Sequence, residues 1–357
     1  MTYVRNAWYV AAWAHDIAPE RPVGVRVLNE PIVLWRNAAG DLTAFEDRCI
    51  HRLAPLSLGR CEGEQLRCMY HGFLYDRTGR VVEIPGQDRI PNSLRLRTYP
   101  VVEKHGWVWV WMGDMAADES LIPPVISLDH PDYILGHGQL DYAAEARLVN
   151  ENLLDLSHVS FLHIDSLRMS ETWARQRPTF TKHERSVRME WWIRNEPPGG
   201  SLEPGESVDT YSRSDFYVPG VLLVTDRLYP VGSADALNGQ EPNLDQPAFS
   251  LSNHAVTPIT DRTSRYFYSA GSHRKYGDEA VRERDTLVAM AKKAFAEDKK
   301  MIEAQQHNID ATPGWRFTPT RNDRGVMLFK QIIEKLAREE STRIIQASHP
   351  TSTSLSG

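Results

Sequence analysis

The chain has 357 residues, of which 41% are hydrophobic and 25% are charged, and its formal net charge is −6. Because no basic surplus is present to neutralise phosphates, nucleic acid is not expected as a partner. No apolar run approaches the roughly eighteen residues that a membrane span needs, and residues 1–20 lack a signal-peptide pattern. Three cysteines are too few for a disulfide framework, so we expect a soluble cytoplasmic protein with one large or two moderate domains.

Residues 1–115 are predicted to form an all-β domain. Two apolar runs within residues 24–47 flank an Asn-Ala-Ala-Gly-Asp turn and predict a hairpin, and residues 74–86 repeat this pattern around a turn that contains glycine. Valine and tryptophan alternate in residues 106–114, which predicts a further strand. Acidic residues and a Pro-Pro pair then follow, so the end of this domain is placed near residue 115.

Residues 116–345 are predicted to form a second domain that mixes strands and helices. Residues 264–271 are expected as a strand, and residues 278–308 carry apolar side chains at helical spacing. Residues 165–215 contain many residues that favour loops, and we expect them to shape the mouth of a pocket. Residues 346–357 are polar and small, which predicts a disordered tail.

All three cysteines lie in one short segment, and two of them are close to a histidine. The pairs are Cys49 with His51 and Cys68 with His71, so each of two loops offers one thiolate and one imidazole. Buried cysteines with hydrogen-bonded histidines would be one explanation. A structural Zn²⁺ site is another, but such sites more often take both cysteines from one Cys-x2-Cys loop. A Rieske [2Fe–2S] cluster, held by two cysteines and two histidines, fits this arrangement best.

A second group of candidate ligands lies within residues 150–163. Asn152, Asp155 and His158 are three residues apart and would share one face of a helix. His158 and His163 are five apart, so both can reach one ion only if the helix breaks between them. Two histidines with one carboxylate form the facial triad of non-haem Fe(II) oxygenases, whereas isolated histidines are more often hydrogen-bonded core residues.

The missing carboxylate is sought in the long helix predicted for residues 278–308. Glu297 and Glu303 have charged or polar neighbours three and four residues away and are expected at half-solvated or solvated positions. The corresponding neighbours of Asp298 are all apolar, namely Ala294, Phe295, Met301 and Ile302. An ionised carboxylate in an apolar stripe is unfavourable unless it is paired or binds a metal, so Asp298 is predicted as the third ligand.

These motifs resemble those of a known enzyme family. The Cys-x-His and Cys-x2-His pairs are similar to the Rieske domain pattern, and residues 152–163 and 297–306 resemble the iron-binding segments of Rieske non-haem iron oxygenase alpha subunits. The chain most resembles the vanillate O-demethylase oxygenase group, in segments such as "NAWYVAAW", "NEPIVLWR" and "PGVLLVTD". The resemblance implies an α+β fold, with an N-terminal all-β Rieske domain and a C-terminal antiparallel sheet with helices in a helix-grip-like arrangement.

The resemblance also implies roles for single residues. The residues implied to bind the [2Fe–2S] cluster are Cys49, His51, Cys68 and His71. Those implied to bind a mononuclear Fe(II) are His158, His163 and Asp298. Asn152 would lie beside the iron, and Asp155 would connect His71 of the partner subunit to His158 and help to pass the electron on. His254 would face the carboxylate of a substrate, although a hydrogen-bonded strand histidine is an equal alternative.

By the same resemblance, the chain is expected to be a monooxygenase that acts on O2 and a small aromatic substrate. The leading hypothesis is O-demethylation of a methoxylated aromatic acid such as vanillate by a homotrimer. Arg168, Arg175 and Arg177 could attract such an anion. Since no Gly-x-Gly-x-x-Gly fingerprint is present, a separate NAD(P)H-dependent reductase or ferredoxin is expected to supply the electrons.

Two other hypotheses stay open at this point. Ring hydroxylation of another aromatic compound would use the same ligand set. A Rieske electron-transfer module or a zinc-binding module, without oxygenase activity, belongs to a different class of protein. Neither kind of module needs a carboxylate in an apolar stripe, which is the feature of Asp298 that favours the oxygenase.

Overall fold

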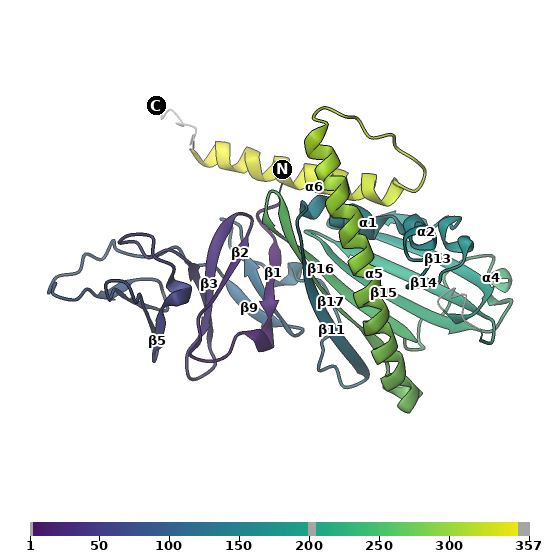
Figure 1. The fold of residues 1–357 in the computed structure, drawn as a ribbon, viewed down its shortest axis with the longest axis horizontal. Helices are drawn as coiled ribbons and strands as arrows, with labels where there is room; N and C mark the ends of the chain where they lie inside the picture. The colour runs from purple at the N-terminus through teal and green to yellow at the C-terminus, as the bar shows by residue number, and fades with distance from the viewer. Residues whose placement is uncertain (1–2, 199–204, 349–357) are drawn as a thin grey trace, which may run out of the picture.

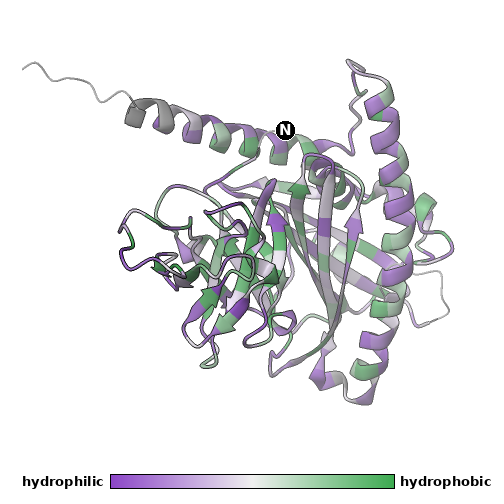
Figure 2. Ribbon diagram, turned by 60° about the vertical axis from the view of Figure 1, so that its left-hand side comes forward, coloured by the Kyte–Doolittle hydropathy of each residue, from purple (hydrophilic) through white to green (hydrophobic). Residues whose placement is uncertain are grey.

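The computed structural model describes residues 3–198 and 205–348. The N-terminal strands lie at one end of an elongated molecule, and a large sheet with its helices lies at the other (Figure 1). In Figure 2, hydrophobic residues gather on the strands of the N-terminal domain, and the long helix carries hydrophilic residues among hydrophobic ones. Within the described ranges, none of the helices combines the length and the apolar character needed to cross a membrane.

The N-terminal domain contains three small antiparallel sheets. Their strand orders are β1-β10-β9, β2-β3-β4 and β5-β6-β7-β8. The strands are β1 (Trp8–Trp13), β2 (Val23–Val27), β3 (Glu30–Arg36), β4 (Leu42–Glu46), β5 (Arg60–Glu62), β6 (Gln65–Arg67), β7 (Leu74–Asp76), β8 (Val81–Glu83), β9 (Val101–Lys104) and β10 (Trp107–Trp111). Short 3-10 helices span Ala14–Asp16, Leu56–Leu58 and Glu119–Leu121.

The C-terminal domain is built on one seven-stranded antiparallel sheet with the order β11-β17-β16-β15-β14-β13-β12. The strands are β11 (Tyr133–Tyr142), β12 (Thr179–Lys182), β13 (Ser186–Glu196), β14 (Val208–Tyr217), β15 (Val221–Tyr229), β16 (Ser250–Thr260) and β17 (Thr263–His273). The helices are α1 (Ala146–Leu154), α2 (Val159–Leu162), α3 (Glu171–Ala174), α4 (Ser233–Ala236), α5 (Asp278–Ala311) and α6 (Arg324–Ser348), with 3-10 turns at Leu156–His158 and Arg274–Tyr276.

Side chains alternate between the two faces of this sheet, and each face packs against a different part of the molecule. We call the face under α5 and α6 the inner face. Here His254 of β16 contacts Phe295 of α5, with ring centroids 5.9 Å apart, and Phe216 contacts Phe329 of α6 at 4.6 Å. On the outer face, Phe267 contacts Trp13 of the N-terminal domain at 6.0 Å. The sheet is therefore enclosed on both sides.

The fold class predicted from the sequence is confirmed: an all-β N-terminal domain precedes an antiparallel sheet with helices. Both predicted hairpins form, as β3 with β4 and as β7 with β8. The predicted strand near residue 107 is β10, and the helix predicted for residues 278–308 is α5. The change from one domain to the other falls between β10 and β11.

Two expectations need correction. Residues 165–215 are not mainly loop, because β12, β13 and most of β14 lie in this interval. The prolines and glycines after residue 196 favour loops, and they drew attention away from the alternating polar and apolar residues of the strands on either side. Helix α6 continues to Ser348, past the expected start of the tail at residue 346, because no proline interrupts it before Pro350. Residues 349–357 of that tail lie outside the described residues.

Phe267 offers a test of the packing between the domains. The side chain is fully buried, so Phe267→Ala is expected to lower the free energy of unfolding by about 3–5 kcal/mol. Urea denaturation followed by tryptophan fluorescence measures the change. Val231→Ala, at a side chain that is 52% exposed, is the control and should change the free energy of unfolding by less than about 0.5 kcal/mol. Equal stability of the two variants would contradict this packing.

Candidate functional site

Two loops of the N-terminal domain carry the four predicted cluster ligands, and the two loops are built in the same way. In each loop the cysteine N–H donates to the carbonyl oxygen five residues on, and the N–H four residues on donates to the cysteine carbonyl. These donor–acceptor pairs are Cys49–Ala54, Leu53–Cys49, Cys68–Phe73 and Gly72–Cys68, at 2.8–3.0 Å. The residue four after each cysteine has a positive φ, 56° for Leu53 and 77° for Gly72. Leucine rarely adopts this conformation, which indicates that the fold holds the first loop in a specific shape.

The thiols lie inside this site and the imidazoles lie at its surface. Cys49 and Cys68 are 2% and 1% exposed, whereas His51 and His71 are exposed and their ring centroids lie 4.5 Å apart. The Tyr75 hydroxyl lies 3.1 Å from the Cys49 sulfur. Partial desolvation and the nearby His51 and Arg52 lower the pKa of His71, which favours the neutral imidazole that binds a metal.

Deeper in the molecule, His158 and His163 direct their Nε2 atoms at one carboxylate. These atoms lie 3.5 and 3.3 Å from Asp298 Oδ1, and the ligand atoms of the three residues lie within 4.8 Å of one another. Asp298 is 4% exposed. Two imidazoles and a buried carboxylate that converge in this way could hold a mononuclear iron.

The remaining ring nitrogen of each histidine is held by a hydrogen bond. His158 Nδ1 lies 2.6 Å from the main-chain oxygen of Asp155, and His163 Nδ1 lies 2.9 Å from Glu297 Oε2. Both oxygens are acceptors, so each Nδ1 carries the proton and each Nε2 keeps a lone pair for a metal. Although burial alone would lower the pKa of His163, the carboxylates of Asp298 and Glu297 raise it.

Asn152 lies beside these three residues. Its Nδ2 donates to Asp298 Oδ1 at 2.9 Å and lies 3.3 Å from His158 Nε2. The amide therefore holds the carboxylate oxygen that the two histidines also face. Asn152 lies in the last turn of α1, and the two histidines follow within nine residues of the end of that helix.

The path of the chain between these residues differs from the expected one. Because α1 ends at Leu154, Asn152, Asp155 and His158 do not share one helical face, and that expectation is wrong. The helix breaks before His158, and the two histidines flank the single turn of α2. The Asp155 carboxylate accepts the Ser157 N–H at 2.9 Å, so Asp155 contacts His158 through its main chain.

Glu297 is the site residue that the sequence reasoning missed. It was expected at an ordinary half-solvated position, but its carboxylate also accepts a hydrogen bond from the Ser166 hydroxyl at 2.5 Å. Its side chain is 25% exposed. Its position next to Asp298 in the sequence could have indicated a role in the site. A helix turns only about 100° per residue, so the side chain that precedes a ligand can reach the outer side of the same site.

His254 lies on the inner face, and both of its ring nitrogens already have partners. Nε2 lies 2.8 Å from Ser252 Oγ, and Nδ1 lies 2.6 Å from the Tyr266 hydroxyl. Burial lowers the pKa of His254 to about 3, so the ring is neutral at physiological pH. A neutral imidazole with two internal partners offers no positive charge to a carboxylate.

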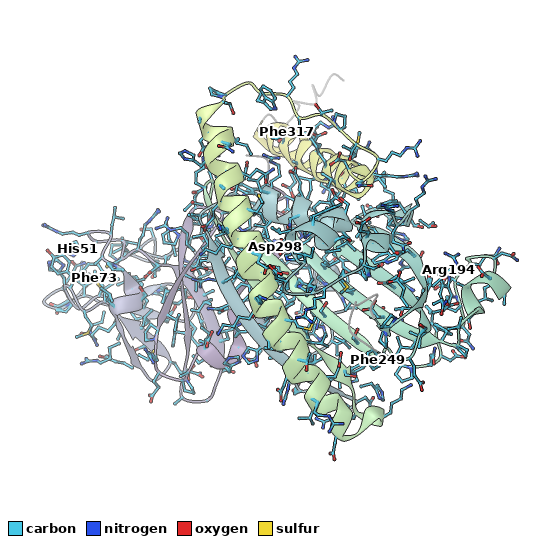
Figure 3. All side chains as sticks on the ribbon, turned by 45° about the vertical axis from the view of Figure 1, so that its right-hand side comes forward. His51, Phe73, Arg194, Phe249, Asp298 and Phe317 are labelled. Carbon is cyan, nitrogen blue, oxygen red and sulfur yellow. The ribbon has the colours of Figure 1, made fainter. Side chains whose placement is uncertain are left out.

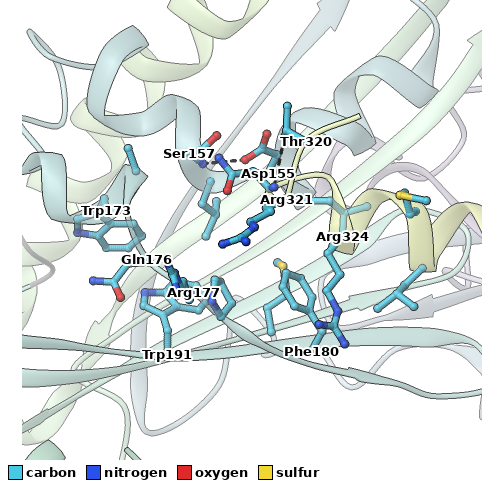
Figure 4. Close-up of a pocket in the computed structure, with 18 of the residues that line it drawn as sticks. Asp155, Ser157, Trp173, Gln176, Arg177, Phe180, Trp191, Thr320, Arg321 and Arg324 are labelled. Atoms are coloured by element: carbon cyan, nitrogen blue, oxygen red, sulfur yellow. Dashed lines mark hydrogen bonds between the residues drawn. The ribbon is translucent and has the colours of Figure 1, made fainter. Parts of the chain in front are cut away.

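Two cavities reach the segment that carries the iron-ligand candidates. One, of about 690 Å³, is lined by Asn152, Asp155 and His158 together with residues of α5 and α6. The other, of about 540 Å³, lies between Asp155, Trp173 and the inner-face residue Trp191 (Figure 4). Of the three arginines considered for anion attraction, Arg177 lines this second cavity, whereas Arg175 pairs with Glu171 at the surface.

Comparison with known proteins gives the family. Residues 7–100 match the Rieske [2Fe-2S] domain, and residues 142–339 match the vanillate O-demethylase oxygenase C-terminal domain. The chain belongs to the Rieske non-haem iron oxygenases. It is 30% identical to the iron-sulfur subunit of a toluene-4-sulfonate monooxygenase system from Comamonas testosteroni, over 95% of this chain and 98% of that protein. It is 32% identical to a vanillate O-demethylase oxygenase subunit from Pseudomonas sp. (strain HR199 / DSM 7063), over 95% and 96%.

The solved structures agree with this assignment. Dicamba monooxygenase bound to dicamba superposes with a TM-score of 0.81 at 29% identity, covering 96% of this chain and all of that one. This Rieske oxygenase is thus an oxidoreductase with a [2Fe–2S] cluster and a mononuclear non-haem iron, and the described residues offer a fitting site for each.

Glu297→Gln tests whether the carboxylate that holds His163 matters to the metal. Loss of the carboxylate charge is expected to lower iron affinity or turnover about 10–100-fold, because the imidazole loses the anionic partner that raises its basicity. Iron content after dialysis and steady-state turnover measure the effect, while the visible spectrum of the cluster should stay unchanged. Glu303→Gln on the same helix is the control, because its amide oxygen can still accept the Ala143 N–H. An iron affinity equal to that of the control would exclude the role of Glu297.

Proposed function

We propose that this chain is the terminal oxygenase of a monooxygenase system and that it removes a methyl group from a methoxylated aromatic acid such as vanillate. The observation that carries the proposal is the convergence of His158, His163 and Asp298 within 4.8 Å in a chain that also has a Rieske domain. The relatives named as demethylases of vanillate and dicamba support the choice of reaction. Hydroxylation of an aromatic ring would give a different product and is the alternative outcome of the test.

In this proposal the two sets of candidate ligands have separate tasks. Cys49, His51, Cys68 and His71 bind the [2Fe–2S] cluster, and His158, His163 and Asp298 bind Fe(II). The iron, when bound, allows O2 to react with the methyl carbon of the substrate. Insertion of one oxygen atom into a methyl C–H bond gives a hemiacetal that collapses to the phenol and formaldehyde. The second oxygen atom takes up two electrons and two protons and leaves as water. Glu297 and the Asp155 carbonyl oxygen keep both imidazoles in the tautomer that a metal needs.

The electrons come, in this proposal, from a separate NAD(P)H-dependent reductase or ferredoxin in the cytoplasm. The exposed rings of His51 and His71 suit contact with such a partner, because they bring the cluster close to the surface. The oxygenase relatives that are named as components or subunits of larger systems support this division of labour.

We further propose that electrons cross between subunits of a homotrimer. His51 and Asp298 lie in separate parts of the subunit (Figure 3), so a direct route within one chain would be long. Exposed apolar residues surround each end of the proposed route. Those near the cluster loops are Leu53, Met69 and Tyr70, and those that line the cavity at His158 are Met301, Phe317 and Met327. Asp155 lines the same cavity, where its carboxylate could accept a hydrogen bond from His71 of the partner subunit.

An anaerobic metal and sulfide analysis followed by turnover tests the proposed function. About three irons and two sulfides per chain are expected, and vanillate with a reductase and O2 should yield formaldehyde and the demethylated phenol. His158→Ala should keep the cluster spectrum and lose turnover. Hydroxylated vanillate without formaldehyde would indicate ring hydroxylation instead. Zinc without sulfide would refute the oxygenase.

Mixed oligomers test the route between subunits. His158→Ala and Cys68→Ala are each expected to be inactive, because one lacks an iron ligand and the other lacks a cluster ligand. In a head-to-tail ring formed from equal amounts of both, about a quarter of the interfaces join an intact cluster to an intact iron site. Co-expressed variants should therefore regain about a quarter of wild-type activity per subunit. No recovery in a mixed oligomer of verified composition would mean that electrons pass within one chain.

A further inference from the structure

A group of buried polar atoms without partners lies on the inner face of the sheet. The atoms are Trp191 Nε1, Thr210 Oγ1, Ser212 Oγ, Ser214 Oγ and Asp226 Oδ1, and none has a hydrogen-bond partner within the described part of the chain. We call these five residues the inner-face polar cluster. Thr210, Ser212 and Ser214 are each at most 1% exposed. Ser212 lies close to Asp226 and favours its ionised form, and only Oδ1 of Asp226 is unpartnered, because Oδ2 accepts the Ser250 hydroxyl at 3.0 Å.

The strand register brings these residues together. Trp191 pairs with Ser212 across β13 and β14, and Ser212 pairs with Asp226 across β14 and β15. Ser214 and Thr210 are the next residues along β14 on the same face. The five side chains therefore form one continuous patch on three adjacent strands.

Such a patch is unusual for a protein interior. A buried donor or acceptor that loses its partner in water and gains none in the protein destabilises the fold, so native structures satisfy nearly all of them. A single orphan atom can be an accident of packing. Five on neighbouring strands of one face indicate that something other than this chain completes their hydrogen bonds.

The patch borders accessible space. Val224, Ser250 and Ser252, which belong to the inner face by their register, are only partly buried, although β15 and β16 are central strands of the sheet. Trp191 also lines the cavity of about 540 Å³, and Figure 4 shows its ring near Trp173 at that cavity. A small molecule could therefore reach the patch.

The patch also lies within reach of the iron site. Ser252 contacts the ring of His254, which contacts Phe295 on α5. Phe295 is one helical turn before Asp298. A substrate with its methyl group at the iron could thus extend over His254 toward the inner-face polar cluster.

Asp226 determines the charge of the patch. Burial raises the pKa of this carboxyl group. Protonated, the group offers one donor and one acceptor, and ionised it offers only acceptors, so it is never positive. The cation that acts on it, Arg227, lies on the outer face, where it donates to the Gln246 carbonyl oxygen and to Thr225. In its ionised form Asp226 repels a second anion in this place.

We propose that the inner-face polar cluster binds an uncharged hydrogen-bonding substituent of the substrate, such as a hydroxyl or carboxamide group, with Asp226 accepting its O–H or N–H. The serine and threonine hydroxyls and the Trp191 N–H complete the hydrogen bonds of that substituent. This inference rests on the proposed function and specifies its substrate class. Vanillate meets the condition only through its phenolic hydroxyl, because a carboxylate in this position would face Asp226.

Two ligands of equal shape test the proposal. 4-Methoxybenzamide and 4-methoxybenzoate differ in charge and in N–H donors, so isothermal titration of the anaerobic holoenzyme with each isolates those properties. The amide is expected to bind at least about tenfold more tightly. Asp226→Asn should bring the two Kd values within about threefold of each other. Equal or tighter binding of the benzoate by the wild-type enzyme, or binding of neither ligand, would overturn the proposal.

A pair of serine variants separates a binding role from a structural one. Ser214 is buried without a partner, whereas Ser264, also buried, donates to the Ala144 carbonyl oxygen at 3.0 Å. Ser214→Ala should weaken amide binding about three- to tenfold without lowering the urea midpoint. Ser264→Ala should lower that midpoint and leave amide binding unchanged. The reverse pattern would overturn the proposal.

The same samples keep this inference apart from the proposed function. Tight amide binding without formaldehyde release, in enzyme with a full iron and sulfide content and a reduced cluster, would refute demethylation but support the inner-face site. Formaldehyde release from the benzoate in preference to the amide would support demethylation and refute the site.

Discussion

A buried carboxylate that faces two imidazoles is the constraint on which the rest of this structure depends. Asp298 is almost fully buried, and the Nε2 atoms of His158 and His163 both approach its Oδ1. An ionised carboxylate in such a place is unfavourable without a compensating positive charge. A divalent metal bound there would supply that charge. The hydrogen bonds that Asn152 and Glu297 add are then understandable as supports that hold ligands in position for the ion.

The large sheet and α5 hold the buried carboxylate and the two imidazoles close together. The ligands come from two segments about 140 residues apart, and only a rigid framework can hold them at fixed distances. The inner face supplies the framework, since Phe295 of α5 packs on His254 and on the neighbouring aromatic rings of β17. The outer face of the same sheet binds the N-terminal domain through Phe267 and Trp13. One sheet therefore supports the iron site on one side and carries the electron-transfer domain on the other.

This arrangement is the reason for the proposal that electrons cross between subunits. The domain that carries the cluster loops packs on the outer face of the sheet, and its exposed His51 lies well away from Asp298 (Figure 3). Leu53, Met69 and Tyr70 of that domain are exposed. The apolar residues that surround the cavity at His158 are likewise exposed. In a head-to-tail assembly, the apolar residues beside the cluster loops of one subunit would cover those around the cavity of the next. The same interface would then bury apolar area and bring the cluster close to the iron site.

The candidate metal ligands could be selected from the sequence because their signal is local. The spacing of Cys49, His51, Cys68 and His71 and the apolar neighbours of Asp298 are properties of short segments. Glu297 was missed because its partner, His163, lies 134 residues away, and spacing along one helix does not show what packs against it. The strands in residues 165–215 were missed because the nearby prolines and glycines dominate the local composition.

The inner-face polar cluster was hidden for a related reason, and it indicates where specificity resides in this enzyme. Along β14 the polar residues Thr210, Ser212 and Ser214 alternate with Tyr211 and Arg213, so neither set looks like a buried face. The fold buries these small hydroxyl groups without giving them hydrogen-bond partners. A sequence chosen only for stability would avoid such buried, unpaired groups. Local rules that fail in this way usually mark a functional site. The relatives are named for different substrates, among them toluene-4-sulfonate, vanillate and dicamba. The inner face can vary between such enzymes without disturbing the candidate ligands on α5 and beside α2. We therefore expect the choice of substrate to depend on this face, and the reaction itself to depend on the ligands above it.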